Sequence, residues 1–170
     1  MDKGGVVYWV TGLSGAGKTT IGTILFNRLK EKKGNIVRLD GDNLRMVFKS
    51  NDYSYEGRKN LGYQYCAMCK MLADQGIDVI ICTIAMYDDV RQWNRDNIKN
   101  YKEIYLRVPI EELIKRDQKG MYTKALHNEM DNVMGINLKY EEPKCPDIVI
   151  DNTGKLSPDQ IVDMIIHKLN

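Results

Sequence analysis

Short apolar runs alternate with amphipathic segments along the chain, and this alternation predicts a parallel α/β fold. The predicted strands are 6–11, 36–39, 77–84, 103–108 and 147–150. Helices are expected over about 18–32, 58–75, 88–99 and 110–116, and a last helix begins with Ser157 as its N-cap and Pro158 at its first position. Strands that alternate with helices form a parallel sheet, here of five strands, with helices on both faces.

The segment from about 118 to 146 interrupts this alternation. It contains Gly120, Gly135, Pro143 and Pro146, and it has little strand character. An irregular stretch of this length inside a compact domain is usually functional, so we expect a lid over a binding site. The length of 170 residues predicts one domain, 1–170, that includes this lid.

A phosphate-binding motif follows the first predicted strand. The pattern G-x-x-x-x-G-K-[ST] is matched at every fixed position, and the residues expected to bind ATP are Gly12, Leu13, Ser14, Gly15, Ala16, Gly17, Lys18, Thr19 and Thr20. Glycines let backbone N–H groups surround phosphate oxygens, and the N-terminus of the next helix adds partial positive charge. We expect Lys18 to reach the β- and γ-phosphates and the Thr19 hydroxyl to bind Mg²⁺, the predicted cofactor.

Charge and composition exclude several classes of partner. Lysine and arginine number 25 and aspartate and glutamate 23, so the formal net charge is +2. A balanced chain is not typical of a general binder of nucleic acids or anionic membranes. No apolar run approaches the roughly 18 residues of a membrane span, and no signal peptide is evident. We therefore expect a cytoplasmic protein, in which Cys66 and Cys69 are reduced thiols packed in a helix; a redox pair is the alternative.

The motif does not by itself name a reaction. The chain lacks the N-K-x-D sequence of GTPases, and its third strand ends in Thr83-Ile84-Ala85-Met86 rather than in the aspartate typical of motor and transporter ATPases. A small-molecule kinase is the interpretation that fits a chain of this size. The alternatives are a nucleotide-binding regulatory module without turnover and a kinase of the sugar or shikimate type.

A second motif, Leu39-Asp40-Gly41-Asp42-Asn43-Leu44-Arg45, follows the second predicted strand. Ligands of parallel α/β sheets bind at the carboxyl ends of the strands, where this motif lies. A carboxylate orients an acceptor hydroxyl or holds Mg²⁺, and an arginine binds an anionic substrate. The sequence does not decide which of Asp40 and Asp42 serves the hydroxyl and which the metal. An acidic turn that caps a helix is the structural alternative.

Together these motifs resemble the adenylylsulfate kinase family over nearly the whole chain. Two further matches are Arg116–Tyr122 with Lys124-Ala125, and Gly135-Ile136 followed by Tyr140-Glu141 and Pro143. The resemblance implies a P-loop kinase fold and transfer of the γ-phosphoryl of Mg·ATP to the ribose 3′-hydroxyl of a nucleotide 5′-phosphoanhydride. It implies catalytic roles for Lys18, Asp40, Asp42, Arg45 and Lys119, and metal binding by Thr19 and Asp42. The substrate-binding residues that it implies are Asp42, Asn43, Leu44, Arg45, Tyr53, Arg58, Leu61, Ile84, Ala85, Lys119, Gly120, Met121, Val133 and Met134.

Departures from the family cluster on the acceptor side. Val133 and Met134 stand where the family has Phe-Thr, whose Phe stacks on the substrate adenine, whereas Tyr53 keeps a second aromatic position. Ala85 replaces a serine that carries a phosphoryl group in some members, which leaves direct transfer. Loss of one base–aromatic stack, worth ~1–3 kcal/mol, favours another nucleotide over adenylylsulfate. The resemblance, taken with these departures, implies cytidine diphosphoramidate as the acceptor, as in the phosphoramidate decoration of bacterial capsules. A divergent adenylylsulfate kinase is the alternative, and a homodimer is left open.

Three smaller signals complete the expectations. Arg91 and Arg95, four apart on a predicted helix, are interpreted as a solvated face, with an anion-binding patch as the alternative. Trp9, Met68, Met71 and Leu72 are expected in the core. The two histidines, His127 and His167, lack an evident partner and are not expected to be catalytic.

Overall fold

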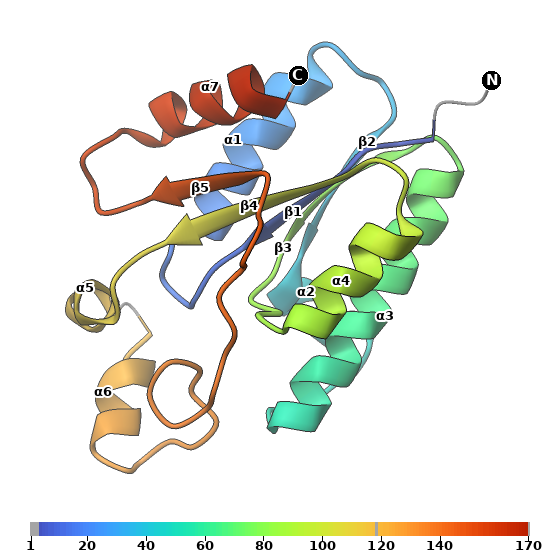
Figure 1. The fold of residues 1–170 in the computed structure, drawn as a ribbon. Coiled ribbons are helices and arrows are strands. Elements are labelled where there is room, and N and C mark those ends of the chain that lie inside the picture. Colours follow the sequence, from blue (N-terminus) through green and yellow to red (C-terminus); the bar gives the residue numbers. More distant parts are fainter. Residues whose placement is uncertain (1–3, 118, 170) are drawn as a thin grey trace.

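Five parallel strands form one sheet in the computed structural model, which describes residues 4–117 and 119–169. The strands are β1 (Val7–Thr11), β2 (Ile36–Asp40), β3 (Asp78–Cys82), β4 (Tyr101–Arg107) and β5 (Ile148–Asp151). Their order is β2-β3-β1-β4-β5, and every neighbouring pair is parallel (Figure 1). The predicted parallel sheet is therefore confirmed.

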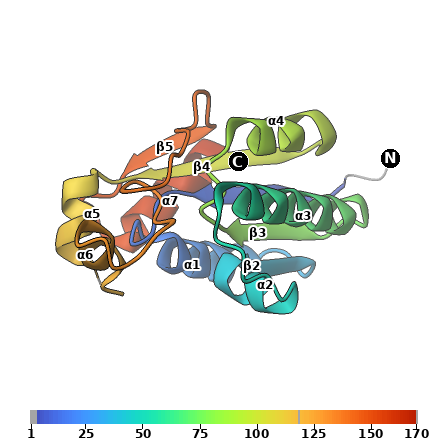
Figure 2. The ribbon, with the colours of Figure 1, turned by 90° about the horizontal axis from the view of Figure 1, so that it is seen from below.

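Helices cover both faces of this sheet. They are α1 (Lys18–Lys30), α2 (Gly41–Val47), α3 (Tyr55–Asp74), α4 (Asp88–Asn97), α5 (Ile110–Arg116), α6 (Met121–Leu126) and α7 (Pro158–Leu169). Helices α1 and α7 pack together on one face, and α3 and α4 pack together on the other. Figures 1 and 2 show α5 and α6 side by side at the end toward which β4 points. The sequence did not predict α2 or α6, which have only 7 and 6 residues.

The core lies around the central strands. Strand β3 is buried along its whole length, and Trp9 in β1 is fully buried, as expected. Cys66 and Cys69 are also fully buried, and burial raises the pKa of the Cys66 thiol to about 12 and that of Cys69 further. Buried thiols of this kind are unreactive, which supports the packed-thiol interpretation.

One core prediction is wrong. Met71 is 56% exposed, whereas Met68 and Leu72 pack against the core as expected. The buried side of α3 carries Cys66, Cys69 and Ala73. Met71 lies between these positions in sequence but projects from the other side of the helix, since successive residues are about 100° apart around the axis.

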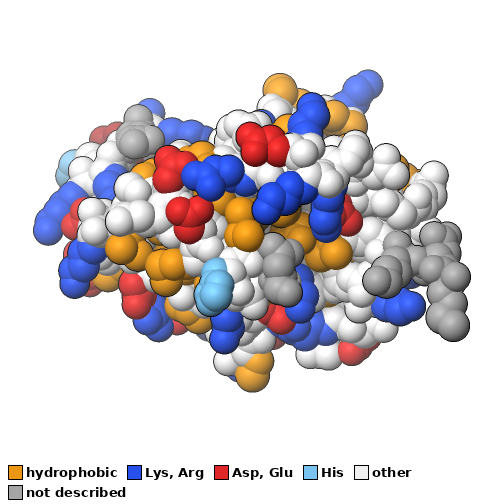
Figure 3. Space-filling model, turned by 90° about the horizontal axis from the view of Figure 1, so that it is seen from above, with side chains coloured by type: hydrophobic (Ala, Val, Ile, Leu, Met, Phe, Trp, Pro, Cys, Tyr) orange, Lys and Arg blue, Asp and Glu red, His pale blue; other side chains and the backbone are white. Residues whose placement is uncertain are grey.

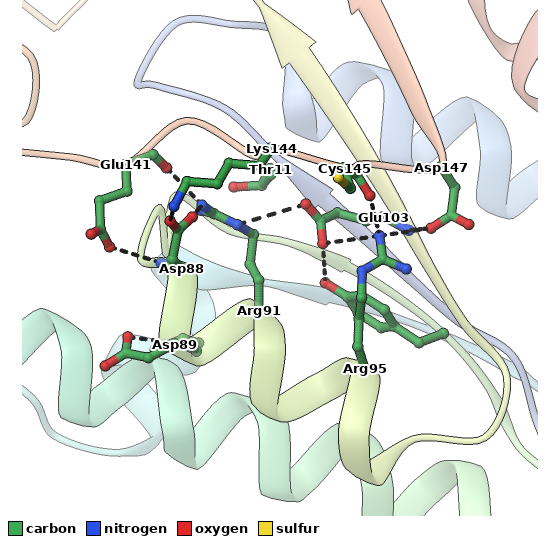
Figure 4. Close-up of polar contacts among 12 residues, drawn as sticks. Thr11, Asp88, Asp89, Arg91, Arg95, Glu103, Glu141, Lys144, Cys145 and Asp147 are labelled. Atoms are coloured by element: carbon green, nitrogen blue, oxygen red, sulfur yellow. Dashed lines mark hydrogen bonds and ion pairs between the residues drawn. The ribbon is translucent and has the colours of Figure 1, made fainter.

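The interpretation of Arg91 and Arg95 as a solvated face is wrong for Arg91, which is buried, whereas Arg95 is an exposed residue. The Arg91 side chain is 4% exposed, and its Nε lies 3.6 Å from Oε1 of Glu103, which is 3% exposed. Nη2 of Arg95 lies 3.4 Å from Oε2 of Glu103, to which the Tyr101 hydroxyl also donates. Figure 4 shows both arginines pointing from α4 toward this glutamate on β4. A buried carboxylate needs such partners, because an uncompensated charge in the interior is costly.

The same arginines hold residues 141–147, which we call the return arm because they lead from the irregular segment into β5. Arg91 Nη2 donates to the Glu141 carbonyl at 2.8 Å, and Arg95 Nη2 donates to the Cys145 carbonyl at 2.8 Å. The Asp88 backbone N–H donates to Oε2 of Glu141 at 2.8 Å. The return arm is thereby fixed against α4 (Figure 4).

Charges of both signs are mixed on the surface. On the face in Figure 3, Lys and Arg side chains lie beside Asp and Glu side chains. Between α1 and α7, Arg28 pairs with Asp159 and Asp163 at 2.8 and 3.0 Å. None of the described helices is long and apolar enough to cross a membrane.

Candidate active site

The loop between β1 and α1 has the conformation that its glycines require. Gly12 and Gly17 have φ of 155° and 93°. A Cβ on Gly12 would lie 2.5 Å from the Leu106 carbonyl oxygen, and one on Gly17 would lie 2.7 Å from Nδ2 of Asn152. Asn152 also donates to the Ala16 carbonyl at 2.9 Å. Asn152, the residue that follows β5, thus packs against Gly17 and hydrogen-bonds to the loop.

Lys18 is partly buried at the start of α1. Its Nζ donates to the Leu13 carbonyl at 2.8 Å. Burial lowers the pKa of the Lys18 ammonium to about 8, although the nearby carboxylates of Asp42 and Asp40 act in the opposite direction. A cation in this position, with a weak carbonyl partner, is suited to exchange that carbonyl for a phosphate oxygen.

A cavity of about 290 Å³ lies over this loop, and we call it the loop cavity. It brings together side chains that are far apart in sequence. Among its lining residues are Lys18, Thr19, Asp40, Asp42, Arg45 and Lys119. It therefore brings together the five predicted catalytic residues, three cations and two carboxylates, from the segments after β1, β2 and α5.

The two carboxylates of the acidic motif have different surroundings. Asp40 is the N-cap of α2: Oδ1 accepts from the Asp42 N–H at 3.1 Å, and Oδ2 accepts from the Thr19 hydroxyl at 2.9 Å. Asp42 is 81% exposed and pairs through Oδ2 with Nζ of Lys119 at 3.0 Å. The motif is thus both a helix cap and a part of the cavity. The carboxylate beside Thr19 is that of Asp40, not of Asp42.

The donor set fits a magnesium ion bound together with nucleotide. A hydroxyl and a carboxylate oxygen meet at Thr19 and Asp40. No group of three His, Cys, Asp or Glu side chains suited to a metal occurs in residues 4–117 and 119–169. Mg²⁺ keeps several waters and is usually held by one or two protein groups and substrate phosphates, so a complete protein cage is not required.

A second cavity of about 610 Å³, the side cavity, adjoins the first. The two share Ser14, Arg58, Ile84 and Met134 in their linings. Its lining includes Tyr53, which is 48% exposed, and Val133 and Met134, which are 3% and 4% exposed. The lining therefore combines one aromatic side chain with aliphatic ones.

Arg58 joins the two segments of the side cavity that carry Tyr53 and Asn132. Its Nε donates to the Tyr53 carbonyl and its Nη2 to the Asn132 carbonyl, each at 2.9 Å. The guanidinium carbons of Arg45 and Arg58 lie 4.2 and 5.2 Å from the centroid of the Tyr53 ring. These distances are within the cation–π range, so the two arginines hold the tyrosine at the edge of the side cavity.

Comparisons with known proteins identify the family. Residues 4–151 match the adenylylsulphate kinase family model. The chain belongs to this family. It is 43% identical to a cytidine diphosphoramidate kinase of Campylobacter jejuni over 99% of both chains, and 35% identical to a probable adenylyl-sulfate kinase of Pyrococcus abyssi over 96% of this chain and 94% of that one.

Solved structures agree with this assignment. The APS kinase of Mycobacterium tuberculosis in complex with AMPPNP and APS has a TM-score of 0.88 at 30% identity, with 98% of each chain covered. A shikimate kinase of Aquifex aeolicus, at 14% identity and a TM-score of 0.60, shares the fold alone. The expected P-loop kinase fold is confirmed, and the protein is a kinase, an ATP-dependent phosphotransferase.

The cavities include most of the predicted site residues of this kinase. Beyond those named above, Gly15, Gly17, Thr20, Leu61 and Ala85 line the loop cavity and Met121 lines the side cavity. The linings of the two cavities do not include Gly12, Leu13, Ala16, Asn43, Leu44 or Gly120. Leu44 is 6% exposed and belongs to the core.

Sequence reasoning missed part of each lining. In the loop cavity the missed residues are Gly41, Tyr65, Cys82, Thr83 and Tyr87, and in the side cavity they are Asn51, Asp52, Ser54, Met130, Asp131 and Asn132. Tyr65 and Tyr87 follow the apolar pattern of the core. The loops 50–54 and 130–132 have no periodicity. The sequence signal that could have identified these loop residues as part of the site is their position beside Tyr53 and Val133 in the irregular segments.

Residues 119–140 cover the carboxyl end of β1 through a few specific bonds. The Tyr122 hydroxyl donates to the Ser14 carbonyl at 2.7 Å, and the Asp117 carboxylate accepts from the N–H groups of Tyr122 and Thr123 at 3.0 and 2.9 Å. The Lys119–Asp42 ion pair joins this segment to α2 across the loop cavity. The cavity is thus bordered on one side by a segment that is held by part-buried bonds and by the exposed Lys119–Asp42 pair.

Proposed function

We propose that this kinase phosphorylates the ribose 3′-hydroxyl of a cytidine nucleotide 5′-phosphoanhydride, specifically cytidine diphosphoramidate. The observation that carries the proposal is the side cavity, whose lining combines the aromatic Tyr53 with the aliphatic Val133 and Met134. One aromatic wall suits a small pyrimidine better than adenine, which loses more stacking area when the second aromatic residue is absent. The 43% identity with a cytidine diphosphoramidate kinase over 99% of both chains supports the same acceptor.

In the proposed complex the γ-phosphoryl of ATP lies in the loop cavity. Lys18 exchanges its bond to the Leu13 carbonyl for the phosphate oxygens, and the backbone N–H groups of residues 12–19 surround the β-phosphate. A bound Mg²⁺ would supply positive charge that stabilises the charge developing on the phosphates. We place it beside Thr19 and Asp40, because their oxygens already lie 2.9 Å apart.

Asp42 is then the group available to the acceptor hydroxyl. Its carboxylate is exposed in the loop cavity, and its partner Lys119 is exposed as well. The 3′-oxygen forms a bond to the γ-phosphorus while the bond from that phosphorus to the ADP oxygen breaks, and the hydroxyl proton passes to Asp42. Arg45, held next to Tyr53, binds the negative 5′ chain of the acceptor.

We further propose that residues 118–146 act as the lid of a single domain, 1–170. Closure of such a lid excludes water from the transfer, and Lys119 is the lid residue that already crosses the loop cavity. The ligands of this proposal are Mg·ATP and one small nucleotide, both of which are metabolites of the cytoplasm. A homodimer is a further hypothesis, which a sedimentation measurement decides.

A second candidate acceptor is adenylylsulfate. It is favoured by Tyr53, which keeps one aromatic wall, and by the TM-score of 0.88 with an APS kinase solved with APS. A screen of ATP-dependent ADP release tests both, with cytidine diphosphoramidate, cytidine diphosphate, adenylylsulfate and shikimate as acceptors. The proposal expects the fastest release with cytidine diphosphoramidate, and a ³¹P NMR signal of a new ribose 3′-phosphate. ADP release with shikimate and with none of the nucleotides would contradict the proposal of a nucleotide acceptor.

A further inference from the structure

The carboxylate residues Asp52 and Asp131 line the side cavity, and they differ in their hydrogen bonds. Oδ1 of Asp52 accepts from the Ser54 N–H at 2.9 Å, and this bonding with Ser54 lowers the pKa of Asp52. Asp131 is exposed and lines the same cavity. Among the hydrogen bonds and ion pairs of the described residues, none involves the Asp131 carboxylate. It is therefore an uncommitted acceptor in the wall of the cavity.

The turn that presents Asp131 is fixed on both sides. The side chain of Asn137 donates from Nδ2 to the Met130 carbonyl and accepts through Oδ1 from the Val133 N–H, both at 2.8 Å. Between these bonds, Asn132 has a φ of 60° and its carbonyl accepts from Arg58. The carboxylate thus projects from a preorganised turn, which lowers the entropic cost of a hydrogen bond to a ligand.

The charge of the acceptor decides which of its parts can face this carboxylate. The 5′ chain is negative and is drawn to the cations Lys18, Arg45 and Lys119 of the loop cavity. An uncompensated carboxylate repels that chain, so it is tolerated only beside the uncharged end of the ligand, which is the base. A carboxylate only accepts hydrogen bonds at neutral pH, and the group of cytosine that donates is the exocyclic 4-amino group.

We propose that Asp131 reads the acceptor base by accepting a hydrogen bond from its exocyclic amino group. The inference rests on the proposed function, because it places the base in the side cavity. Cytosine and adenine carry such an amino group, whereas uracil and hypoxanthine have a carbonyl oxygen in its place. Asp131 therefore rejects the carbonyl bases by leaving two acceptors opposed, and Tyr53 and Val133 set the size of the base.

The decisive variant is Asp131→Asn, which has the same shape and whose amide can donate to a uracil carbonyl. Cytidine and uridine diphosphoramidates are compared by kcat/KM at saturating Mg·ATP. The unmodified kinase is expected to prefer cytidine, and Asp131→Asn is expected to lower that preference by about fivefold or more. Asp131→Ala should lose cytidine turnover without gaining uridine turnover. Glu129→Gln, an equal change of charge at an exposed residue outside both linings, should leave the ratio unchanged.

The outcome separates the two proposals. If the unmodified kinase prefers adenylylsulfate, the proposed acceptor is wrong, and the same variants are measured with adenylylsulfate and its inosine analogue. A fall in the ratio of amino to carbonyl bases in either pair supports the role of Asp131. Ratios that stay the same in both Asp131 variants, with circular dichroism showing folded protein, would overturn it.

Discussion

At the scale of single residues, the active site separates two carboxylates that the sequence leaves equivalent. Asp40 and Asp42 are two positions apart, and sequence reasoning placed both at the site without deciding between them. The difference arises from partners that are distant in the chain: Thr19 is 21 residues from Asp40, and Lys119 is 77 residues from Asp42. The motif predicts that both carboxylates lie at the site, but the fold determines which side chains each of them contacts.

Substitution of each carboxylate by its amide tests this separation. Asp40→Asn and Asp42→Asn should each lower kcat by about 10²-fold or more, because each removes a charged group from the transfer. Raised Mg²⁺ should partly restore Asp40→Asn, which has a weakened metal site, and should not restore Asp42→Asn. Steady-state kinetics over a Mg²⁺ titration measure this. Asp74→Asn, in an exposed ion pair with Lys70, is the control that should leave the rate unchanged. Rescue of Asp42→Asn instead would reverse the assignment.

The lowered pKa of Lys18 predicts a pH dependence of nucleotide binding. The ammonium form binds phosphate, and in the free enzyme its pKa is about 8. Bound phosphate raises that pKa, so affinity is complete below pH 8 and is lost as the pH rises through it. The Kd of a Mg·ATP analogue should be about tenfold higher at pH 9 than at pH 7. Calorimetric titration measures it. Lys18→Met should bind weakly with a flat profile, and an unmodified kinase with a flat profile would contradict the prediction.

At the scale of elements, the sequence pattern predicted helix α4 but not the burial of its Arg91. Arg91 and Arg95 are spaced as on a solvated helix face, yet both contact Glu103 of β4. Periodicity reveals which residues of one helix share a face, but it does not reveal a buried charge on another element. The short helices α2 and α6 were missed for a related reason, because 7 and 6 residues are too few to show a helical period.

Removal of Arg91 should destabilise the protein strongly. Arg91→Met leaves Glu103 buried without its more deeply buried α4 partner and frees the Glu141 carbonyl of the return arm. Breaking a buried pair from one side costs about 3–5 kcal/mol in the free energy of unfolding. Urea denaturation measures this, and Lys70→Met, in the exposed pair with Asp74, should cost about 0.3–0.5 kcal/mol. A loss for Arg91→Met as small as for Lys70→Met would show that the buried cluster contributes little to stability.

At the scale of the whole molecule, the parallel sheet explains why separate motifs meet in one place. The phosphate loop follows β1, the acidic motif follows β2, Ile84 and Ala85 follow β3, and the proposed lid follows β4 and α5. The carboxyl ends of parallel strands share one edge, so a correct prediction of the strands largely predicts the site. The division into a loop cavity and a side cavity was not predictable, because it depends on where irregular loops such as 50–54 and 130–134 fold back.

The identity of the acceptor is the central claim, and a competition assay tests it most directly. Cytidine diphosphoramidate and adenylylsulfate are supplied together at equal concentration with Mg·ATP, and the two 3′-phosphorylated products are quantified at low conversion. Their ratio equals the ratio of the two kcat/KM values. With one aromatic wall at Tyr53 and an aliphatic wall at Val133 and Met134, the cytidine product is expected to predominate. Predominance of 3′-phosphoadenylylsulfate would contradict the account and assign this kinase to adenylylsulfate.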